Sequence, residues 1–191
     1  MKGRESGMPD EAWWATFFEP DGALDRLFGA DGPQGDIVEF GCGYGTFTLP
    51  AARRTGGVVT ALDIEPDMVE RVVRQAAASN RDNVRASVRD FVAHGTGLDD
   101  ASQDHAMIFN LLHLEDPLAL LREARRNLRP DGTLSVVHWR SDIPTPRGPS
   151  LDIRPTPAQC RHWMQEAGFE DIRRIDLQRA CPYHFALIAR R

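Results

Sequence analysis

The stretch Val38-Glu-Phe-Gly-Cys-Gly-Tyr-Gly-Thr-Phe47 decides the fold of this chain. Three glycines at alternating positions follow a short apolar run and precede a predicted helix, which allows the backbone to approach a ligand closely. A glycine loop between a strand and a helix is typical of parallel sheets that bind nucleotides. Glycines also occur in ordinary turns, so the ligand of this loop has to be inferred from the residues around it.

Strands and helices alternate along the chain on both sides of this loop. Apolar runs predict strands at 36–40, 58–63, 84–88, 105–110, 134–139, 172–177 and 184–189. Helical patterns cover 9–18, 22–28, 46–55, 66–79, 117–128 and 157–168, with turns at 130–132 and a proline-rich connection at 140–157. The alternation indicates a parallel sheet covered by helices on both faces, and the short gap before the last strand predicts an antiparallel hairpin.

Composition limits the class of protein. The chain has 191 residues and a net charge of −5, with 41% apolar and 27% charged residues, which favours one globular domain without a nucleic-acid surface. No apolar run reaches the roughly 20 residues of a membrane span, and the N-terminus lacks a signal-peptide core, so we expect a cytoplasmic protein. Three distant cysteines predict no structural metal site, and Lys2 as the only lysine excludes a P-loop.

Acidic and polar side chains stand where predicted strands end. Asp63 follows the glycine loop at about the distance, ~20 residues, at which a carboxylate reaches ribose hydroxyls. Glu39 precedes the first glycine and disfavours a pyrophosphate, and Thr46 stands where a pyrophosphate binder has its third glycine. A nucleoside that carries an ammonium group or a cationic sulfur fits these acids better. Asp90 and Asn110 follow two further strands and face the same edge.

An ordered set of motifs now resembles one known family. The motifs are Val-Glu-Phe-Gly-Cys-Gly-Tyr-Gly, Ala-Leu-Asp-Ile-Glu-Pro-Asp-Met, Arg-Asp-Phe, Asn-Leu-Leu-His-Leu-Glu-Asp-Pro and Leu-Arg-Pro-Asp-Gly-Thr-Leu. Over about residues 33–190 they resemble class I S-adenosylmethionine-dependent methyltransferases. The resemblance implies an α/β three-layer sandwich with a Rossmann-like, mostly parallel sheet in the order 3-2-1-4-5-7-6, strand 7 antiparallel. We expect this domain at 33–191 and an N-terminal helical extension at 1–32.

The resemblance also implies that S-adenosyl-L-methionine is the cofactor. Glu39 would lie near its ammonium group, Asp63 at the ribose hydroxyls, and Asp90 at the adenine amino group. The full set of cofactor-binding residues implied by position is Glu39, Gly41, Cys42, Gly43, Gly45, Asp63, Ile64, Asp90, Phe91, Asn110 and Leu111. Cys42 is expected to pack against the backbone rather than to act as a nucleophile.

Methyl transfer needs no general base unless the acceptor holds its proton tightly. His113 and His138 both lie near strand ends and are the candidate catalytic residues, although a satisfied pocket histidine has the same sequence signature. Arg140, Arg147 and Arg154 either clamp an anionic acceptor or only solvate a loop. The size of the chain favours a small-molecule acceptor, and we expect a monomer or a homodimer.

Further alternatives stay open from sequence alone. Trp13, Trp14, Phe17 and Phe18 predict an apolar helix face that either closes over the cofactor as a lid or only packs on the sheet. An NAD-dependent oxidoreductase would also use Asp63. A third alternative is a catalytically silent protein that binds the cofactor and acts as a partner-binding subunit. An exposed apolar face would indicate this alternative.

Overall fold

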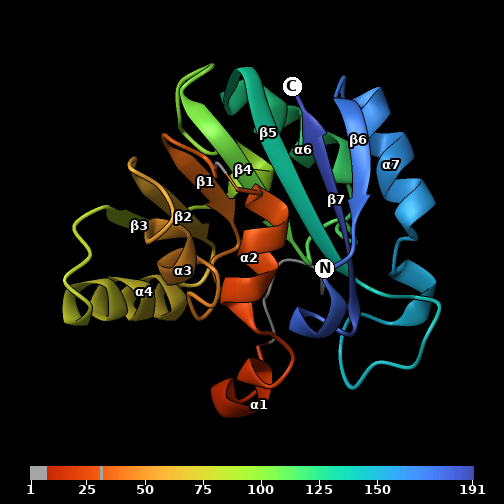
Figure 1. Ribbon diagram of the computed structural model, residues 1–191, viewed down its shortest axis with the longest axis horizontal. Helices are drawn as coiled ribbons and strands as arrows, with labels where there is room; N and C mark the ends of the chain where they lie inside the picture. The colour runs from red at the N-terminus through yellow and green to blue at the C-terminus, as the bar shows by residue number, and fades with distance from the viewer. Residues whose placement is uncertain (1–7, 31) are drawn as a thin grey trace.

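The computed structural model describes residues 8–30 and 32–191; the remainder of the predicted N-terminal extension lies outside the described residues. Within these ranges, seven strands form one sheet in the order β3-β2-β1-β4-β5-β7-β6 (Figure 1). The strands are β1 Ile37–Phe40, β2 Val59–Asp63, β3 Val84–Val88, β4 Gln103–Phe109, β5 Leu128–Trp139, β6 Glu170–Ile175 and β7 His184–Arg190. The predicted strand order is confirmed.

Pairing along the sheet also follows the prediction. β1 lies between β2 and β4, and β3 and β5 extend the parallel part of the sheet on either side. β7 runs antiparallel to both β5 and β6, which confirms the predicted hairpin. The parallel strands therefore end together at one edge of the sheet, where a ligand site is expected.

The helices have local reasons for where they begin. They are α1 Glu11–Ala15, α2 Pro20–Phe28, α3 Thr48–Ala52, α4 Pro66–Ala78, α5 Phe91–His94, α6 Pro117–Asn127 and α7 Pro157–Glu166, with short 3-10 turns η1 Leu151–Ile153 and η2 Gln178–Ala180. Proline stands in the first turn of α2, α4, α6 and α7, where its missing N–H costs nothing. Thr156 and Gln159 close a capping box on α7.

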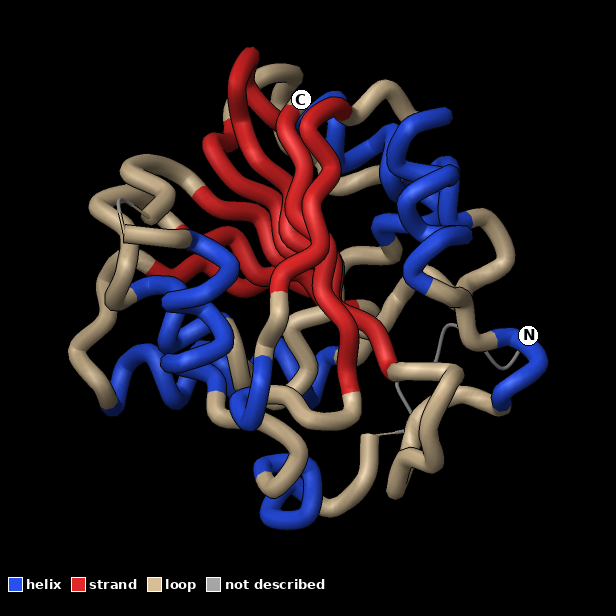
Figure 2. The backbone as a smooth tube through the Cα atoms, turned by 45° about the vertical axis from the view of Figure 1, so that its right-hand side comes forward, coloured by secondary structure: helices blue, strands red, loops and turns tan. Residues whose placement is uncertain are grey.

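Helices cover both faces of the sheet, so the chain is a three-layer sandwich (Figures 1 and 2). One face carries Val38, Phe40 and Ile108, which pack with the apolar faces of α6 and α7. The opposite face carries Ile37 and Met107, which pack with α2 and α3. Strand residues alternate between these two cores, because successive side chains of a strand point to opposite faces.

Besides the two short 3-10 turns, four elements differ from the sequence prediction by more than two residues at an end or by their presence. The expected turn at 130–132 is a bulge inside β5, because β4 pairs with Leu128 before it and Thr133 after it, and Asp131 has a left-handed φ of 65°. α1 and α3 are shorter than the patterns at 9–18 and 46–55, and α5 is a short helix that the sequence did not indicate. Among the helices of residues 8–30 and 32–191, none is both long and apolar enough to cross a membrane.

Candidate functional site

A cavity of about 720 Å³ opens at the carboxyl edge of the parallel strands. Its walls come from the ends of β1, β2 and β4, from the segment after β5 and from the chain before α1. A volume of this size lies within the range of roughly 300–1,000 Å³ that small-molecule sites occupy. The cavity brings together the segments from which the sequence motifs come.

Ten of the eleven predicted cofactor residues line this cavity. They are Glu39, Gly41, Cys42, Gly43, Asp63, Ile64, Asp90, Phe91, Asn110 and Leu111. Gly45 does not line it: a Cβ atom there would lie 3.1 Å from the side chain of Val72 and 2.9 Å from that of Gln75. Gly45 therefore gives α4 its close approach to the loop, while the preceding glycines face the cavity.

Asp63 ties β2 to the glycine loop. Its carboxylate accepts a hydrogen bond from the Gly43 N–H at 2.8 Å and another from the Glu65 N–H at 3.0 Å. The Ile64 backbone N–H also interacts with this carboxylate, which can accept about four hydrogen bonds and so has room for a further donor. Burial raises the pKa of Asp63 above its ordinary value, so the backbone donors support a charge that the site otherwise disfavours.

Glu39 is the buried acid at the end of β1. Its side chain is 3% exposed and accepts a hydrogen bond from the Thr48 hydroxyl at 2.5 Å. Burial, followed by the nearby charge of Asp63, raises the pKa of Glu39 to about 8. Glu39 is therefore mostly neutral at pH 7 until a cation enters the cavity.

The cysteines show no nucleophilic character. Cys42, Cys160 and Cys181 are buried and free. Burial raises the pKa of the Cys42 thiol, and the charges of Glu39 and Asp63 raise it further. In the part of the chain that the structure describes, no group of three or more His, Cys, Asp or Glu side chains could hold a metal ion.

Asp90 and Phe91 stand at the start of α5, on one wall of the cavity. The Asp90 carboxylate caps this helix by accepting from the Ala93 N–H at 2.9 Å. Arg89, which also lines the cavity, donates to the carbonyls of His94 at 2.7 Å and Gly95 at 2.8 Å. These bonds hold the end of the short helix in place.

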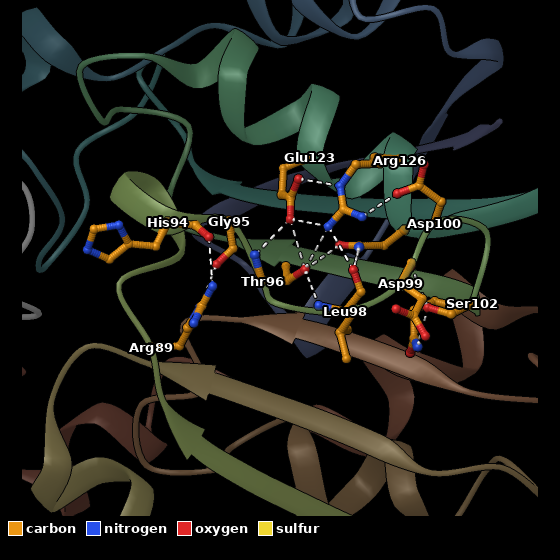
Figure 3. A network of polar contacts seen from close by, with 12 residues as sticks. Arg89, His94, Gly95, Thr96, Leu98, Asp99, Asp100, Ser102, Glu123 and Arg126 are labelled. Atoms are coloured by element: carbon orange, nitrogen blue, oxygen red, sulfur yellow. Dashed lines mark hydrogen bonds and ion pairs between the residues drawn. The ribbon is translucent and has the colours of Figure 1, made fainter.

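A polar network anchors the loop that follows α5 (Figure 3). Glu123 on α6 accepts from the Thr96 N–H at 2.7 Å and pairs with Arg126 at 2.7 Å. Arg126 also reaches Asp100 and the Leu98 carbonyl. The Arg126 hydrogen bond lowers the pKa of Glu123 to about 2, so the pair stays ionised over the working range of pH.

Asn110 occupies a strained position between β4 and β5. It has a left-handed φ of 60°, and its side-chain oxygen accepts from the Trp139 N–H at 3.1 Å. Its amide nitrogen lies 3.4 Å from Nε2 of His184. His184 lies under the ring of Trp139, with centroids 4.1 Å apart, so the wall behind Asn110 is aromatic.

The two candidate catalytic histidines have different positions. His113 lines the cavity, whereas His138 is fully buried and is not part of its wall. Nδ1 of His113 lies 3.3 Å from Nε2 of His138, and Nδ1 of His138 lies 3.2 Å from the carbonyl oxygen of Trp139. Burial lowers the pKa of both rings, that of His138 to about 3.

The chain before β1 lies over the glycine loop. Trp14 lines the cavity and donates from its indole nitrogen to the Thr46 hydroxyl at 2.9 Å. The Tyr44 hydroxyl donates to the Pro9 carbonyl at 2.6 Å, and Glu11 pairs with Arg71 on α4. These contacts fasten α1 beside the loop.

The arginines of the connection after β5 take separate roles. Arg154 is 8% exposed and donates to the Arg140 and Pro149 carbonyls and the Thr145 hydroxyl. Arg140 pairs with Asp142 at 2.7 Å. Arg147 is the arginine of the three that lines the cavity. Arg154 is therefore built into the connection and shapes it.

Several cavity residues were not predicted from sequence. Trp139 and Thr46 were noticed only as a strand end and as a missing glycine, and Met8 and Gly148 gave no signal at all. His184 was not predicted either, because a strand position alone does not show that β7 places this histidine beside Asn110. Such contacts join segments far apart in sequence, and only the sheet order brings them together.

Comparisons with known proteins agree with this geometry. The family profile described as "Methyltransferase domain" matches residues 37–132. A Streptomyces fradiae protein described as uncharacterized, 37.1 kDa, in transposon TN4556, is 32% identical over 169 residues, which are 83% of this chain and 47% of that protein. The ubiquinone biosynthesis O-methyltransferase of Xanthomonas campestris is 35% identical over 104 residues, covering 53% of this chain and 42% of that enzyme. The chain thus spans a little under half the length of these curated relatives.

Among solved structures, the fold is similar to that of a SAM-dependent methyltransferase from Aquifex aeolicus. The TM-score is 0.79 at 21% identity, and the match covers 95% of this chain and 94% of the other. At 21% identity, this similarity shows that the two proteins share a fold. Because the matched profile runs from β1 through the glycine loop to the bulge of β5, the chain belongs to the methyltransferase-domain family, and its strand order is the one that the resemblance to class I methyltransferases implied.

Proposed function

We propose that this chain transfers the methyl group of S-adenosyl-L-methionine to a small-molecule acceptor by in-line displacement. The observation that carries the proposal is the cavity in which Glu39, Asp63 and the glycine loop meet. The methyl carbon moves to the acceptor, the S–C bond breaks, and its electron pair stays on sulfur to give S-adenosyl-L-homocysteine. Because the sulfonium is already a leaving group, the protein mainly aligns the reactants and excludes water.

The cavity residues supply a donor or acceptor for each part of the cofactor. The Asp63 carboxylate would accept from the ribose hydroxyls, and Glu39 would compensate the ammonium group. Asp90 and the Phe91 backbone would bind the adenine edge, and the Asn110 and Leu111 carbonyls would share the ammonium. In this assignment Gly45 supports the loop without touching the ligand.

The remaining wall of the cavity would receive the acceptor. It is formed by His113, Trp139 and the segment from Arg147 to Ser150. A cavity of about 720 Å³ would hold a small molecule beside the cofactor. The curated relative named as a ubiquinone biosynthesis O-methyltransferase supports a small-molecule acceptor. The segment 1–32, as far as it is described, would close this space as a lid.

Calorimetric titration with S-adenosyl-L-homocysteine, NAD and NADP tests the proposal. We expect binding of the adenosyl ligand alone. Asp63→Ala should weaken that binding about tenfold or more, because a buried charge-assisted hydrogen-bond partner is lost. Asp67→Ala, an exposed acid at the start of α4, is the matched control and should change little. Binding of NAD without the adenosyl ligand would overturn the assignment.

A further inference from the structure

The hydrogen bonds of the buried histidine pair have a defined direction. A backbone carbonyl oxygen only accepts, so the contact from Nδ1 of His138 to the Trp139 oxygen requires a proton on that nitrogen. Burial lowers the pKa of His138 to about 3, so its ring is neutral and carries this proton alone. Nε2 of His138 is therefore an acceptor.

The same logic fixes the tautomer of His113. Its Nδ1 lies 3.3 Å from Nε2 of His138, and a hydrogen bond to that acceptor places the His113 proton on Nδ1. Nε2 of His113 is then unprotonated. In the described part of the chain no hydrogen bond involves Nε2 of His113, and His113 lines the cavity. The arrangement leaves a lone pair for a bound molecule.

We propose that Nε2 of His113 is the proton acceptor for a hydroxyl group of the methyl acceptor, and that His138 and the Trp139 carbonyl hold His113 in this tautomer. The inference rests on the proposed methyltransferase function. In the step, the acceptor oxygen forms a bond to the methyl carbon, the S–C electrons stay on sulfur, and the hydroxyl proton moves to Nε2. His113 is the catalytic residue and His138 is a positioning residue.

A hydroxyl acceptor fits this site better than a thiol. Thiols ionise near pH 8.5, whereas a phenolic hydroxyl has a pKa of about 10 and gains more from a base. Burial, followed by the charge of Arg154, lowers the pKa of His113, so the ring is unprotonated at neutral pH. Other charged or titratable groups are His138, which contacts His113, His184, which interacts with His138, and the residues of the cavity wall Glu39, Asp63, Arg89, Asp90, Glu115 and Arg147. The rate should fall only when the pH drops below the ordinary histidine range.

Nuclear magnetic resonance tests the tautomers directly. Long-range ¹H–¹⁵N spectra of histidine-labelled protein with S-adenosyl-L-homocysteine should show both rings protonated at Nδ1 and unprotonated at Nε2 at pH 7. Spectra of His113→Gln and His138→Gln assign the signals. A His113 ring that carries its proton on Nε2, or is charged at pH 7, would overturn the inference even if the ligand binds. A protein that does not bind the ligand would instead overturn the proposed function.

Phenol probes test the catalytic role. We expect His113→Gln to lower kcat about 100-fold for phenol itself, in line with general-base catalysis, and to have little effect on a nitrophenol that is already ionised at the assay pH. His138→Phe should lower kcat for phenol about tenfold. His138→Gln should lower it less, because an amide oxygen can still accept a hydrogen bond from His113. The affinity for S-adenosyl-L-homocysteine should stay unchanged in all three variants. Equal losses for both phenols, or transfer to amine and thiol probes only, would contradict the assignment.

Discussion

Glu39 is a carboxyl whose charge depends on what the cavity holds. It is buried beside Asp63, and its hydrogen bond from Thr48 does not offset the loss of solvation, so its pKa stands at about 8. A cationic ligand reverses this balance, since an opposite charge favours the ionised form. Binding of the cofactor and ionisation of Glu39 are therefore coupled.

This coupling predicts proton release on binding. At pH 7, binding of S-adenosyl-L-homocysteine should release up to one proton from Glu39, and affinity should rise with pH until about pH 8. Calorimetry in two buffers of different ionisation enthalpy measures the proton count. In Glu39→Gln, which keeps an acceptor for Thr48, this release should vanish. The ligand's own amino group contributes equally in both proteins, so an unchanged proton count in the variant would refute the coupling.

At the scale of elements, α1 is attached by side chains that also belong to the cavity. Trp14 bonds to Thr46, and Tyr44 of the glycine loop bonds to the backbone at Pro9. The helix itself is one short turn with no buried residue, so it has little stability of its own. Its position depends on contacts with the loop, which is the property expected of a segment that closes over a ligand.

The two neighbouring tryptophans give a matched test of the lid. Trp14→Ala should weaken binding of S-adenosyl-L-homocysteine about tenfold and speed its dissociation, because a wall of the cavity and a hydrogen bond are lost. Trp13, 44% exposed and absent from the cavity wall, should tolerate alanine with less than about a twofold change. Stopped-flow fluorescence measures the rates. Equal effects of the two variants would point to general loss of packing instead.

Element boundaries mark where local sequence stops being informative. The strand from Leu134 was predicted to begin after a turn, but pairing with β4 extends it back to Leu128 through a bulge. The pattern at 46–55 was read as a helix, whereas the glycine loop continues in turns up to Thr48. In both cases tertiary contacts override a local preference.

For the whole molecule, buried titratable groups set the dependence of stability on pH. His105, His138 and His184 each have a pKa of about 3 in the folded state, because burial disfavours their charge. Between pH 6.5 and 3 the unfolded chain binds more protons at these sites, so the free energy of unfolding decreases as pH falls. Glu39, with its raised pKa, acts in the opposite sense between its unfolded value of 4.5 and about 8.

These shifts predict a stability maximum near pH 6.5. Below it, His105, His138 and His184 each gain a proton on unfolding and Glu39 loses one, a net of two from these four groups, or roughly 3 kcal/mol per pH unit. His113, whose pKa is also lowered by burial, steepens the slope further. Between this maximum and about pH 8, Glu39 is ionised in the unfolded chain but still largely protonated in the folded protein, so the free energy of unfolding decreases as pH rises. Urea unfolding at a series of pH values measures the slope. His105→Asn should reduce the acid slope by about one proton, and His162→Asn, at an exposed site on α7, should leave it unchanged. A flat profile between pH 4.5 and 6.5 would contradict this account.

The sequence predicted most of the fold because its strong patterns are local. Strand order and ten cavity residues follow from motifs that each lie at one strand end. His138 was predicted as a catalytic candidate, but that it lies behind the cavity wall, and that His184 lies beside Asn110, did not follow, because both depend on β7 pairing with β5. The contribution of Trp14 needed the path of the chain before β1. Residues that act through a distant neighbour leave no local pattern.

The parallel strands divide the molecule into two ends with different tolerance to change. The cavity gathers the segments that leave the strands, whereas the turn around Asn80 to Asp82, between α4 and β3, enters the sheet from the other end. The sheet separates that turn from the site. A dye, an affinity tag or a surface linkage placed there would report on the protein, or immobilise it, without blocking the entry of cofactor or acceptor.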